Sequence, residues 1–167
     1  MAVIVISGIP GSGKTTLARQ LAPALGAFLI SKDVIKEALL DVLGSGDLIW
    51  TQRLSRAAHL AMYRVAAEQR ADIVLEAHFY RGVAEPELGQ LGQELVQVWC
   101  RCPISIAHER YLRRRDDPTR HPGHLPEHQD DEATRHWRET DPAPLDLDAP
   151  LVVVDTSTEV ETEQLAT

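Results

Sequence analysis

The sequence predicts an α/β fold in which a parallel sheet carries helices on both of its faces. Short apolar runs rich in β-branched residues alternate along the chain with longer segments of helical periodicity, and this alternation is typical of parallel sheets. A glycine-rich loop connects the first apolar run to the first helical segment. The chain has 167 residues, the usual length of one domain, and we expect a single domain over residues 1–167.

Five strands are expected. The first, Val3–Ser7, is an almost continuous apolar run, which indicates a strand buried on both faces. The other four are bounded by glycine, proline or polar residues, which commonly interrupt strands. They are Ala27–Ser31, Asp72–Ala77, Val96–Cys102 and Leu151–Asp155.

Helices are expected between these strands. Leu17, Leu21 and Leu25 recur every four residues and predict a first helix that ends at Gly26. A second helix is expected to begin at Asp33 or its neighbour and to break near Gly44. Further helices are expected over Ile49–Gln69, Ile104–Arg115 and Asp130–Glu139, in a less regular form over Val83–Leu95, and at the C-terminal end of the chain.

The acidic composition narrows the class of partner. The formal net charge is −8 and the pI is about 5.3. Such an acidic chain disfavours nucleic acid as a partner, since proteins that bind nucleic acid usually present a basic surface.

The chain has no run of about 20 apolar residues that would predict a membrane span, and it does not begin with the basic region of a signal peptide. Cys100 and Cys102 are interpreted as small apolar strand residues with reduced thiols. We therefore expect a cytoplasmic protein.

The loop after the first strand matches the pattern G-x-x-x-x-G-K-[ST]. Its glycines let backbone N–H groups turn toward an anion, and the following helix adds its N-terminal N–H groups and its dipole. The lysine is expected to neutralise the β- and γ-phosphate oxygens, and the threonine hydroxyl to bind Mg²⁺. The motif predicts a nucleotide site made of Gly8, Pro10, Gly11, Ser12, Gly13, Lys14, Thr15 and Thr16.

The pattern Asn/Thr-Lys-x-Asp, with which GTPases recognise guanine, is absent from the chain. ATP is therefore the expected phosphate donor, with Mg²⁺ as the accompanying metal ion.

Three features together resemble the small P-loop kinases, an AAA-type ATP-binding group. They are the glycine-rich loop, Asp33 in the segment ISKDVIKEALLD just after the second predicted strand, and a later arginine-bearing helix. The group includes chloramphenicol 3-O-phosphotransferase, gluconate kinase, the zeta-toxin kinases and polynucleotide 5′-kinase. The resemblance implies a three-layer P-loop NTPase fold with an arginine-bearing lid at approximately residues 115–130. It also implies that Asp33 accepts the proton of the attacking hydroxyl group.

The expected fold supports this role for Asp33. Ligands of open parallel sheets bind beyond the carboxyl ends of the strands, and Asp33 is expected just past one such end. A carboxylate there can orient and deprotonate an alcohol. The alternative is that Asp33 only caps the N-terminus of a helix, where Asp is common. The two roles are compatible.

Other candidates lie around the same edge of the predicted sheet. Glu76 is a lone carboxylate in an apolar strand, which is costly unless it is used. It is expected to bind Mg²⁺ through water or to hydrogen-bond the P-loop, with a purely structural hydrogen bond as the alternative. His78 and Tyr80 are candidates for the acceptor pocket, or else ordinary loop residues. Lys36 follows Asp33 by one turn, at a place where polynucleotide kinases have an arginine that touches the substrate phosphate.

Several arginines are candidates for the lid. Arg110 and Arg114 are four residues apart and therefore share one helix face. The resemblance to adenylate-kinase-like lids implies that Arg110 lies on the adenine side and that Arg114 stabilises the charge of the transferring phosphate. Arg120 is expected to enter the site when the lid closes, and Arg53 to bind an acidic group of the acceptor. The alternative for the lid arginines is a solvated basic helix end.

Three histidines follow in the pattern H-x2-H-x3-H, at His121, His124 and His128. The spacing is only loosely compatible with zinc, and no nearby cysteine adds a ligand. Contact of one histidine with substrate or phosphate is a second interpretation, and a solvated loop is a third.

The expected function is transfer of the γ-phosphate of ATP to a hydroxyl group of a small molecule, with Asp33 as the general base and with Lys14 and Arg114 as the other catalytic residues. One alternative is a polynucleotide or nucleoside 5′-hydroxyl kinase, which the acidic composition disfavours. Another is a nucleotide-dependent ATPase switch without an acceptor. The sequence leaves the identity of the acceptor open.

Overall fold

The computed structural model describes residues 1–115, 117, 118, 120–123 and 142–160. Its centre is a five-stranded parallel sheet with the strand order β2-β3-β1-β4-β5. The strands are β1 (Ala2–Ser7), β2 (Phe28–Ser31), β3 (Ile73–Glu76), β4 (Glu94–Arg101) and β5 (Leu151–Asp155). The predicted α/β fold with five parallel strands is therefore confirmed.

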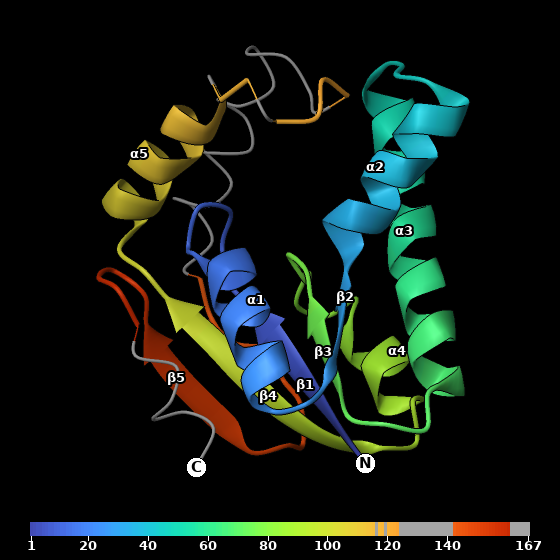
Figure 1. Ribbon diagram of the computed structural model, residues 1–167, viewed down its shortest axis with the longest axis vertical. Coiled ribbons are helices and arrows are strands. Elements are labelled where there is room, and N and C mark those ends of the chain that lie inside the picture. The colour runs from blue at the N-terminus through green and yellow to red at the C-terminus, as the bar shows by residue number, and fades with distance from the viewer. Residues whose placement is uncertain (116, 119, 124–141, 161–167) are drawn as a thin grey trace.

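Five helices are present in the described part of the chain. They are α1 (Lys14–Ala24), α2 (Lys32–Leu43), α3 (Leu48–Glu68), α4 (Glu85–Gly89) and α5 (Ile104–Arg115). Figure 1 shows α1 in front of the sheet and the antiparallel pair α2 and α3 along one side.

The helices cover both faces of the sheet because alternate residues of each strand point to opposite faces. On one face Val3 and Val5 pack with Met62 of α3 and Leu88 of α4, and on the other Ile4 and Ile6 pack with leucines of α1. This division explains why β1 is apolar along almost its whole length. The predicted layers are confirmed.

Two sequence predictions about element bounds were wrong. The segment Val83–Leu95 holds only the one-turn helix α4, because Gly92 adopts a positive φ of 66° and β4 already begins at Glu94. At its other end β4 stops at Arg101, so Cys102 lies beyond the strand, half-buried, while Cys100 is buried within it. Burial raises the pKa of the Cys100 thiol to about 12. The helices predicted over Asp130–Glu139 and at the C-terminal end lie outside the described residues.

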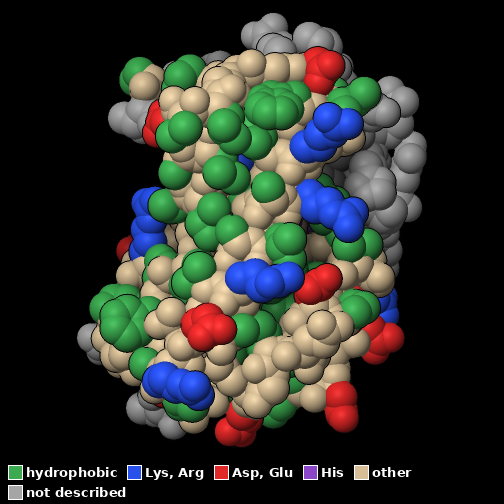
Figure 2. Space-filling model, turned by 90° about the vertical axis from the view of Figure 1, so that its right-hand side faces the viewer, with side chains coloured by type: hydrophobic (Ala, Val, Ile, Leu, Met, Phe, Trp, Pro, Cys, Tyr) green, Lys and Arg blue, Asp and Glu red, His purple; other side chains and the backbone are tan. Residues whose placement is uncertain are grey.

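The outer side of the helix pair carries many apolar side chains. Figure 2 views this side and shows hydrophobic side chains between separate charged ones. Exposed residues of the two helices include Val34, Val42, Leu43, Ile49, Leu60 and Val65. None of the helices in the described part of the chain is both long and apolar enough to cross a membrane.

The carboxyl ends of three neighbouring strands bring polar residues to one edge of the sheet. Glu76, the last residue of β3, is aligned with Ile6 of β1 on one side and with Ser31 of β2 on the other. The loop that follows β1 and the start of α2 lie at this same edge (Figure 1). Parallel sheets bind their ligands at such an edge.

Candidate active site

The P-loop connects β1 to α1 and is shaped by glycines. Gly11 and Gly13 have φ values of 79° and 84°, in the left-handed region that favours glycine. A Cβ atom on Gly11 would also overlap the backbone carbonyl of Ala107 in α5, so the loop packs directly against that helix. The Ser12 N–H donates to the Ile9 carbonyl at 3.0 Å, which closes the turn. The predicted loop therefore has the compact shape that phosphate binding needs.

Lys14 is buried at the first position of α1. Its Nζ donates to the Ile9 carbonyl at 3.3 Å, within its own loop. Burial lowers the pKa of Lys14, whereas the carboxylates of Glu76 and Asp33 act to raise it and Arg114 acts to lower it. The charges of Asp33 and Arg114 thus both act on Lys14.

Glu76 joins the P-loop to the end of β2. Its Oε1 accepts a 2.9 Å hydrogen bond from the Thr15 hydroxyl, and its Oε2 accepts one of 2.7 Å from the Ser31 hydroxyl. Only 1% of Glu76 is exposed, so both bonds are shielded from water. The hydroxyl of Thr15 and the carboxylate of Glu76 are the hard oxygen ligands that Mg²⁺ prefers, and their placement fits a magnesium site at the P-loop.

Asp33 lies in the first turn of α2, directly after the carboxyl end of β2. Its Oδ1 pairs with Lys32 Nζ at 2.7 Å, and about half of its side chain is exposed. The N-cap of α2 is Ser31 and not Asp33, so the alternative in which Asp33 only caps the helix is not the arrangement found.

His78 supports the P-loop from the segment after β3. Its Nδ1 lies 3.2 Å from the carbonyl of Gly8, which requires Nδ1 to carry the proton and donate it. Burial and the charge of Lys14 lower the pKa of His78 to about 4. Tyr80 packs edge-on against the His78 ring at 4.7 Å and is about half exposed. His78 is thus in contact with the backbone of the P-loop.

Lys36 lies on the same face of α2 as Asp33, and only 6% of it is exposed. Burial lowers its pKa to about 8, and the nearby Lys32 and Arg120 act in the same direction.

Arg120 stacks over the Tyr111 ring at 5.5 Å. We call residues 117, 118 and 120–123, the described part of the predicted lid, the lid segment; it lies between α5 and α2 in Figure 1.

The two arginines of α5 have different surroundings. Arg110 donates to the backbone carbonyls of Thr156 and Ser157 at 2.6 and 2.7 Å, which fastens α5 to the loop after β5. Its guanidinium also lies beside Gly13 of the P-loop. Arg114 is exposed and acts on Lys14 through its charge. Arg110 therefore connects α5 to the loop after β5, whereas Arg114 makes no such contact with any described residue and acts on Lys14 only through its charge.

Other sequence candidates lie outside this group. Arg53 is exposed on α3 and makes no hydrogen bond or ion pair to any described residue. His121 lies 3.0 Å from Asp41 of α2 through its Nε2, and its Nδ1 accepts from the Gly123 N–H. Among the described residues no group of three or more potential ligands could hold a metal ion. His124 and His128 are not among the described residues.

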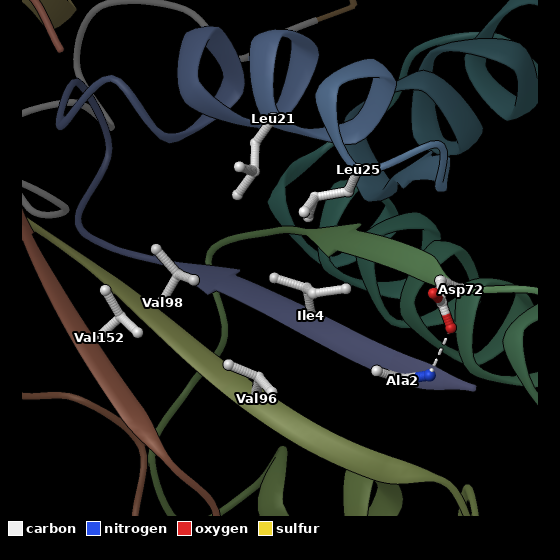
Figure 3. Close-up of a pocket in the computed structure, with 8 residues that line it drawn as sticks. All are labelled: Ala2, Ile4, Leu21, Leu25, Asp72, Val96, Val98 and Val152. Carbon is white, nitrogen blue, oxygen red and sulfur yellow. Dashed lines mark hydrogen bonds between the residues drawn. The ribbon is translucent and has the colours of Figure 1, made fainter. Parts of the chain in front are cut away.

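A separate apolar pocket of about 280 Å³ lies at the opposite end of the strands. Figure 3 shows Leu21 of α1 and Leu25, the residue after this helix, above it and strand residues such as Ile4 and Val98 below. Among the described residues that line it, Asp72 is the only charged one, and its Oδ1 accepts from the Ala2 N–H at 2.7 Å. Because this pocket lies at the amino ends of the strands, it is distinct from the P-loop site.

Three residues of the site were missed in the sequence. Ser31 holds Glu76, Lys32 pairs with Asp33, and His59 of α3 lies near enough to Lys32 and Asp33 for both charges to act on it. Burial lowers the pKa of His59, and its buried Nε2 has no partner among the described residues. Ser31 and Lys32 directly precede Asp33, so their position at the end of a predicted strand was a usable signal, whereas His59 lies in an ordinary helical pattern.

Comparisons with known proteins agree with this geometry. The model of the AAA domain family matches residues 3–140. A cytidylate kinase of Ignicoccus hospitalis is 32% identical over 118 residues, which cover 68% of this chain and 65% of the relative. An adenylyl-sulfate kinase of Aeromonas hydrophila is 34% identical over 116 residues, with coverage of 65% and 57%. The chain spans between about half and two thirds of the length of the curated relatives it matches.

Solved structures are similar over nearly the whole chain. A candidate kinase from Chloroflexus aurantiacus superposes with a TM-score of 0.89 at 29% identity, covering 99% of this chain and 94% of that one. A gluconokinase from Sinorhizobium meliloti has a TM-score of 0.66 at 20% identity, covering 99% and 89%, and so shares the fold. The extent of the family match, together with the similarity to the candidate kinase structure, shows that the chain belongs to the AAA domain family and, within it, to the small P-loop kinases.

Proposed function

We propose that the protein transfers the γ-phosphate of ATP to a hydroxyl group of a small molecule, with Mg²⁺ as the metal ion. The observation that carries this proposal is the position of Asp33. Its carboxylate acts electrostatically both on Lys14 of the P-loop and on Lys36 of α2. A base between the phosphate site and a second, separate site is what transfer to an alcohol needs.

The surrounding residues support the individual roles. Backbone N–H groups of the P-loop and the ammonium group of Lys14 would hold the phosphates of ATP, and Thr15 with Glu76 would hold Mg²⁺, which supplies charge neutralisation at the phosphate oxygens. Asp33 would accept the proton of the hydroxyl group. Arg114, whose charge reaches Lys14, would stabilise the negative charge of the transferring phosphate.

The names of relatives support the same class of reaction. The similar proteins include a gluconokinase and a shikimate kinase crystallised with shikimate. Among the residues proposed to contact the acceptor, Lys36 is buried and His78 and Arg120 are half-buried, whereas Tyr80 and Arg53 are exposed. We expect Arg53 to contribute least.

The test is ADP release from Mg·ATP across a panel of hydroxylated metabolites, antibiotics and a 5′-hydroxyl oligonucleotide. Asp33→Asn keeps the shape of the side chain but removes the base, so acceptor-stimulated turnover should fall about 10²- to 10⁴-fold. Asp148→Asn, an exposed position in the connection before β5, serves as the matched control and should retain full activity. Wild-type turnover in Asp33→Asn would contradict the role of Asp33.

A nucleoside monophosphate kinase is the second candidate, because curated relatives are named cytidylate kinases. There the acceptor is a phosphate oxygen that carries no proton at neutral pH, so no general base is required. Formation of CDP from CMP, at a rate that Asp33→Asn lowers by less than about tenfold, would favour this candidate over transfer to an alcohol.

A further inference from the structure

Lys32 is a mostly buried lysine whose ammonium group contacts Asp33. It is the first residue of α2 and directly precedes Asp33 in the chain. Its Nζ lies 2.7 Å from Asp33 Oδ1, and 12% of its side chain is exposed, against 51% for Asp33. A lysine near the surface usually extends its ammonium group into water. Here the cation is held inside the protein, and the carboxylate is the partner that contacts solvent.

The charge of Lys32 acts on groups from three parts of the fold. It lowers the pKa of His59 in α3, of His78 after β3 and of Lys36 in α2. For His59 and Lys36 it is the largest effect after burial itself. The ammonium group is therefore directed inward, as its low exposure also requires.

The two histidines on which Lys32 acts are neutral. The Nδ1 of His59 lies 3.0 Å from the Ser55 carbonyl, so Nδ1 carries the proton and donates it. Burial and then the charge of Lys32 lower the pKa of His59, while burial and Lys14 lower that of His78 to about 4. Neither ring therefore adds a second cation beside Lys32 at neutral pH.

Asp33 is the anion that compensates Lys32. Among the ion pairs of the described residues, Lys32 takes part in the one with Asp33 alone. An ion pair between two exposed side chains usually contributes little, whereas a mostly buried cation depends on its anion. The contact acts in both directions, because Lys32 also holds one oxygen of Asp33 and favours the charged form of that carboxylate.

Lys32 differs in this respect from the cations of the phosphate site. The charged groups that act most on Lys14 are Glu76, Asp33 and Arg114, so Asp33 is the member of the 2.7 Å pair that belongs to that group. An effect of Lys32 on phosphate transfer would therefore pass through Asp33.

We propose that Lys32 is the positioning residue of the general base. Its ammonium group fixes the carboxylate of Asp33 in one orientation and keeps it ionised while the acceptor hydroxyl group approaches. The proposal rests on the proposed phosphotransfer. In that reaction the hydroxyl oxygen bonds to the γ-phosphorus of ATP, the bond from this phosphorus to the oxygen of the β-phosphate breaks, ADP leaves, and the hydroxyl proton passes to Asp33.

The pairing can be tested without turnover. Protein labelled with 13C at the aspartate carboxyl groups is titrated with pH by NMR, in the absence of any acceptor, and the signal lost in Asp33→Asn is assigned to Asp33. Lys32→Met removes the charge from a side chain of similar length, and Lys32→Arg keeps it. Arg64→Met, which removes an exposed charge from α3, is the matched control.

We expect the pKa of Asp33 to rise by roughly one unit in Lys32→Met, because the carboxylate loses the cation that favours its charged form. Most of this rise should be absent in Lys32→Arg, and all of it in Arg64→Met. Lys32→Gln gives the same comparison through a second neutral side chain, and thermal unfolding checks that each variant is folded. An unchanged pKa of Asp33 in the neutral variants would show the proposal to be wrong, even if an alcohol is phosphorylated.

Kinetics with an accepted alcohol test the orientation of the base. At a pH where Asp33 is ionised in every variant, Lys32→Met should lower kcat about ten- to hundredfold, with little change in the KM for ATP or for the acceptor. Lys32→Arg should recover most of kcat, and Arg64→Met should retain it. A change confined to KM would contradict a positioning role.

The pH dependence of kcat tests the charge of the base. A base must be ionised to accept a proton, so kcat should fall as the pH decreases through the pKa of Asp33. In Lys32→Met this fall should begin about one pH unit higher than in the wild-type protein, and in Arg64→Met at the wild-type pH. A wild-type profile in Lys32→Met would overturn the proposal. A raised pKa of Asp33 in a protein that phosphorylates no alcohol would instead count against the proposed function and leave the pairing supported.

Discussion

Thr15 Oγ1 lies 2.9 Å from Glu76 Oε1, although the two residues are 61 positions apart in the chain. The bond joins the first turn of α1 to the last residue of β3. The other carboxylate oxygen of Glu76 accepts a hydrogen bond from the Ser31 hydroxyl at the end of β2. Three elements of the fold thus meet at the position where the P-loop would hold its metal ion.

The first prediction concerns the charge of Glu76. Glu76→Gln keeps the size of the side chain but removes its negative charge, and it offers an amide N–H₂ group to one hydroxyl, which must then accept instead of donate. We expect kcat to fall about 10- to 100-fold and the Mg²⁺ concentration for half-maximal activity to rise, as is usual for groups that orient metal ligands. Activity measured against Mg²⁺ concentration checks this. Thr15→Ser, which keeps the hydroxyl, should change both values much less.

The second prediction concerns the contact of the P-loop with α5. Gly11→Ala introduces a Cβ atom that overlaps the carbonyl of Ala107, at a φ of 79°. The free energy of unfolding should fall by roughly 2–4 kcal/mol, as measured by urea denaturation. Gly26→Ala is the matched control, because its φ is 65° but nothing lies within 4 Å of the added atom. It should cost only about 1 kcal/mol, and equal losses in both variants would contradict the proposed clash.

The third prediction concerns Arg110 as a positioning residue. Because its two nitrogen atoms bind the carbonyls of Thr156 and Ser157, the fork shape of the guanidinium matters more than its charge. Arg110→Lys and Arg110→Met should therefore weaken nucleotide binding to a similar extent, about tenfold, as measured by calorimetry with an ATP analogue. Full rescue by lysine would instead indicate direct contact of the charge with a phosphate.

The fourth prediction concerns acid stability. The pKa of His78 is about 4 in the folded protein against an ordinary value of 6.5, so the unfolded chain takes up a proton first as the pH falls. The stability that His78 contributes is complete above pH 6.5 and decreases toward pH 4, by up to about 3 kcal/mol. Burial lowers the pKa of His59 as well. Protonation of His59 in the unfolded chain therefore also reduces the free energy of unfolding as the pH falls.

Urea denaturation at several pH values tests this effect. His78→Asn can still donate an N–H to the Gly8 carbonyl but does not titrate, so the decrease in free energy of unfolding between pH 6.5 and 4 should be smaller than in the wild-type protein. An unchanged pH dependence would show that His78 is protonated in the folded state.

The phosphate site was predictable from local sequence because it is almost entirely local in the chain. The glycines, Lys14 and Thr15 are consecutive or nearly so, and the strand before them and the helix after them follow from apolar periodicity. The position of Asp33 beyond β2 was predictable for the same reason. The arrangement of helices on both faces of the sheet was predictable as well, since alternating apolar runs and helical segments allow few other arrangements.

Contacts between distant segments were harder to predict. Arg110 and Arg114 share one face of α5, as their spacing requires, but the sequence did not show that Arg110 binds the carbonyls after β5. His78 was a candidate for the acceptor pocket or an ordinary loop residue, and the sequence did not show that its Nδ1 contacts the backbone of the P-loop. Both contacts depend on which loops the fold brings together, and loops far apart in the chain leave no local pattern.

The sequence by itself determined the phosphate-binding loop, the parallel sheet and the carboxylate of Asp33 beside them, because each depends on residues close together in the chain. Only the tertiary structure decided that Glu76 holds both Thr15 and Ser31, and that Lys36 is buried beside Arg120 of the lid segment. The physical reason is that burial and charge interactions are set by distances in space. The cost of a buried lysine becomes visible only when the helix that carries it is packed against the lid segment.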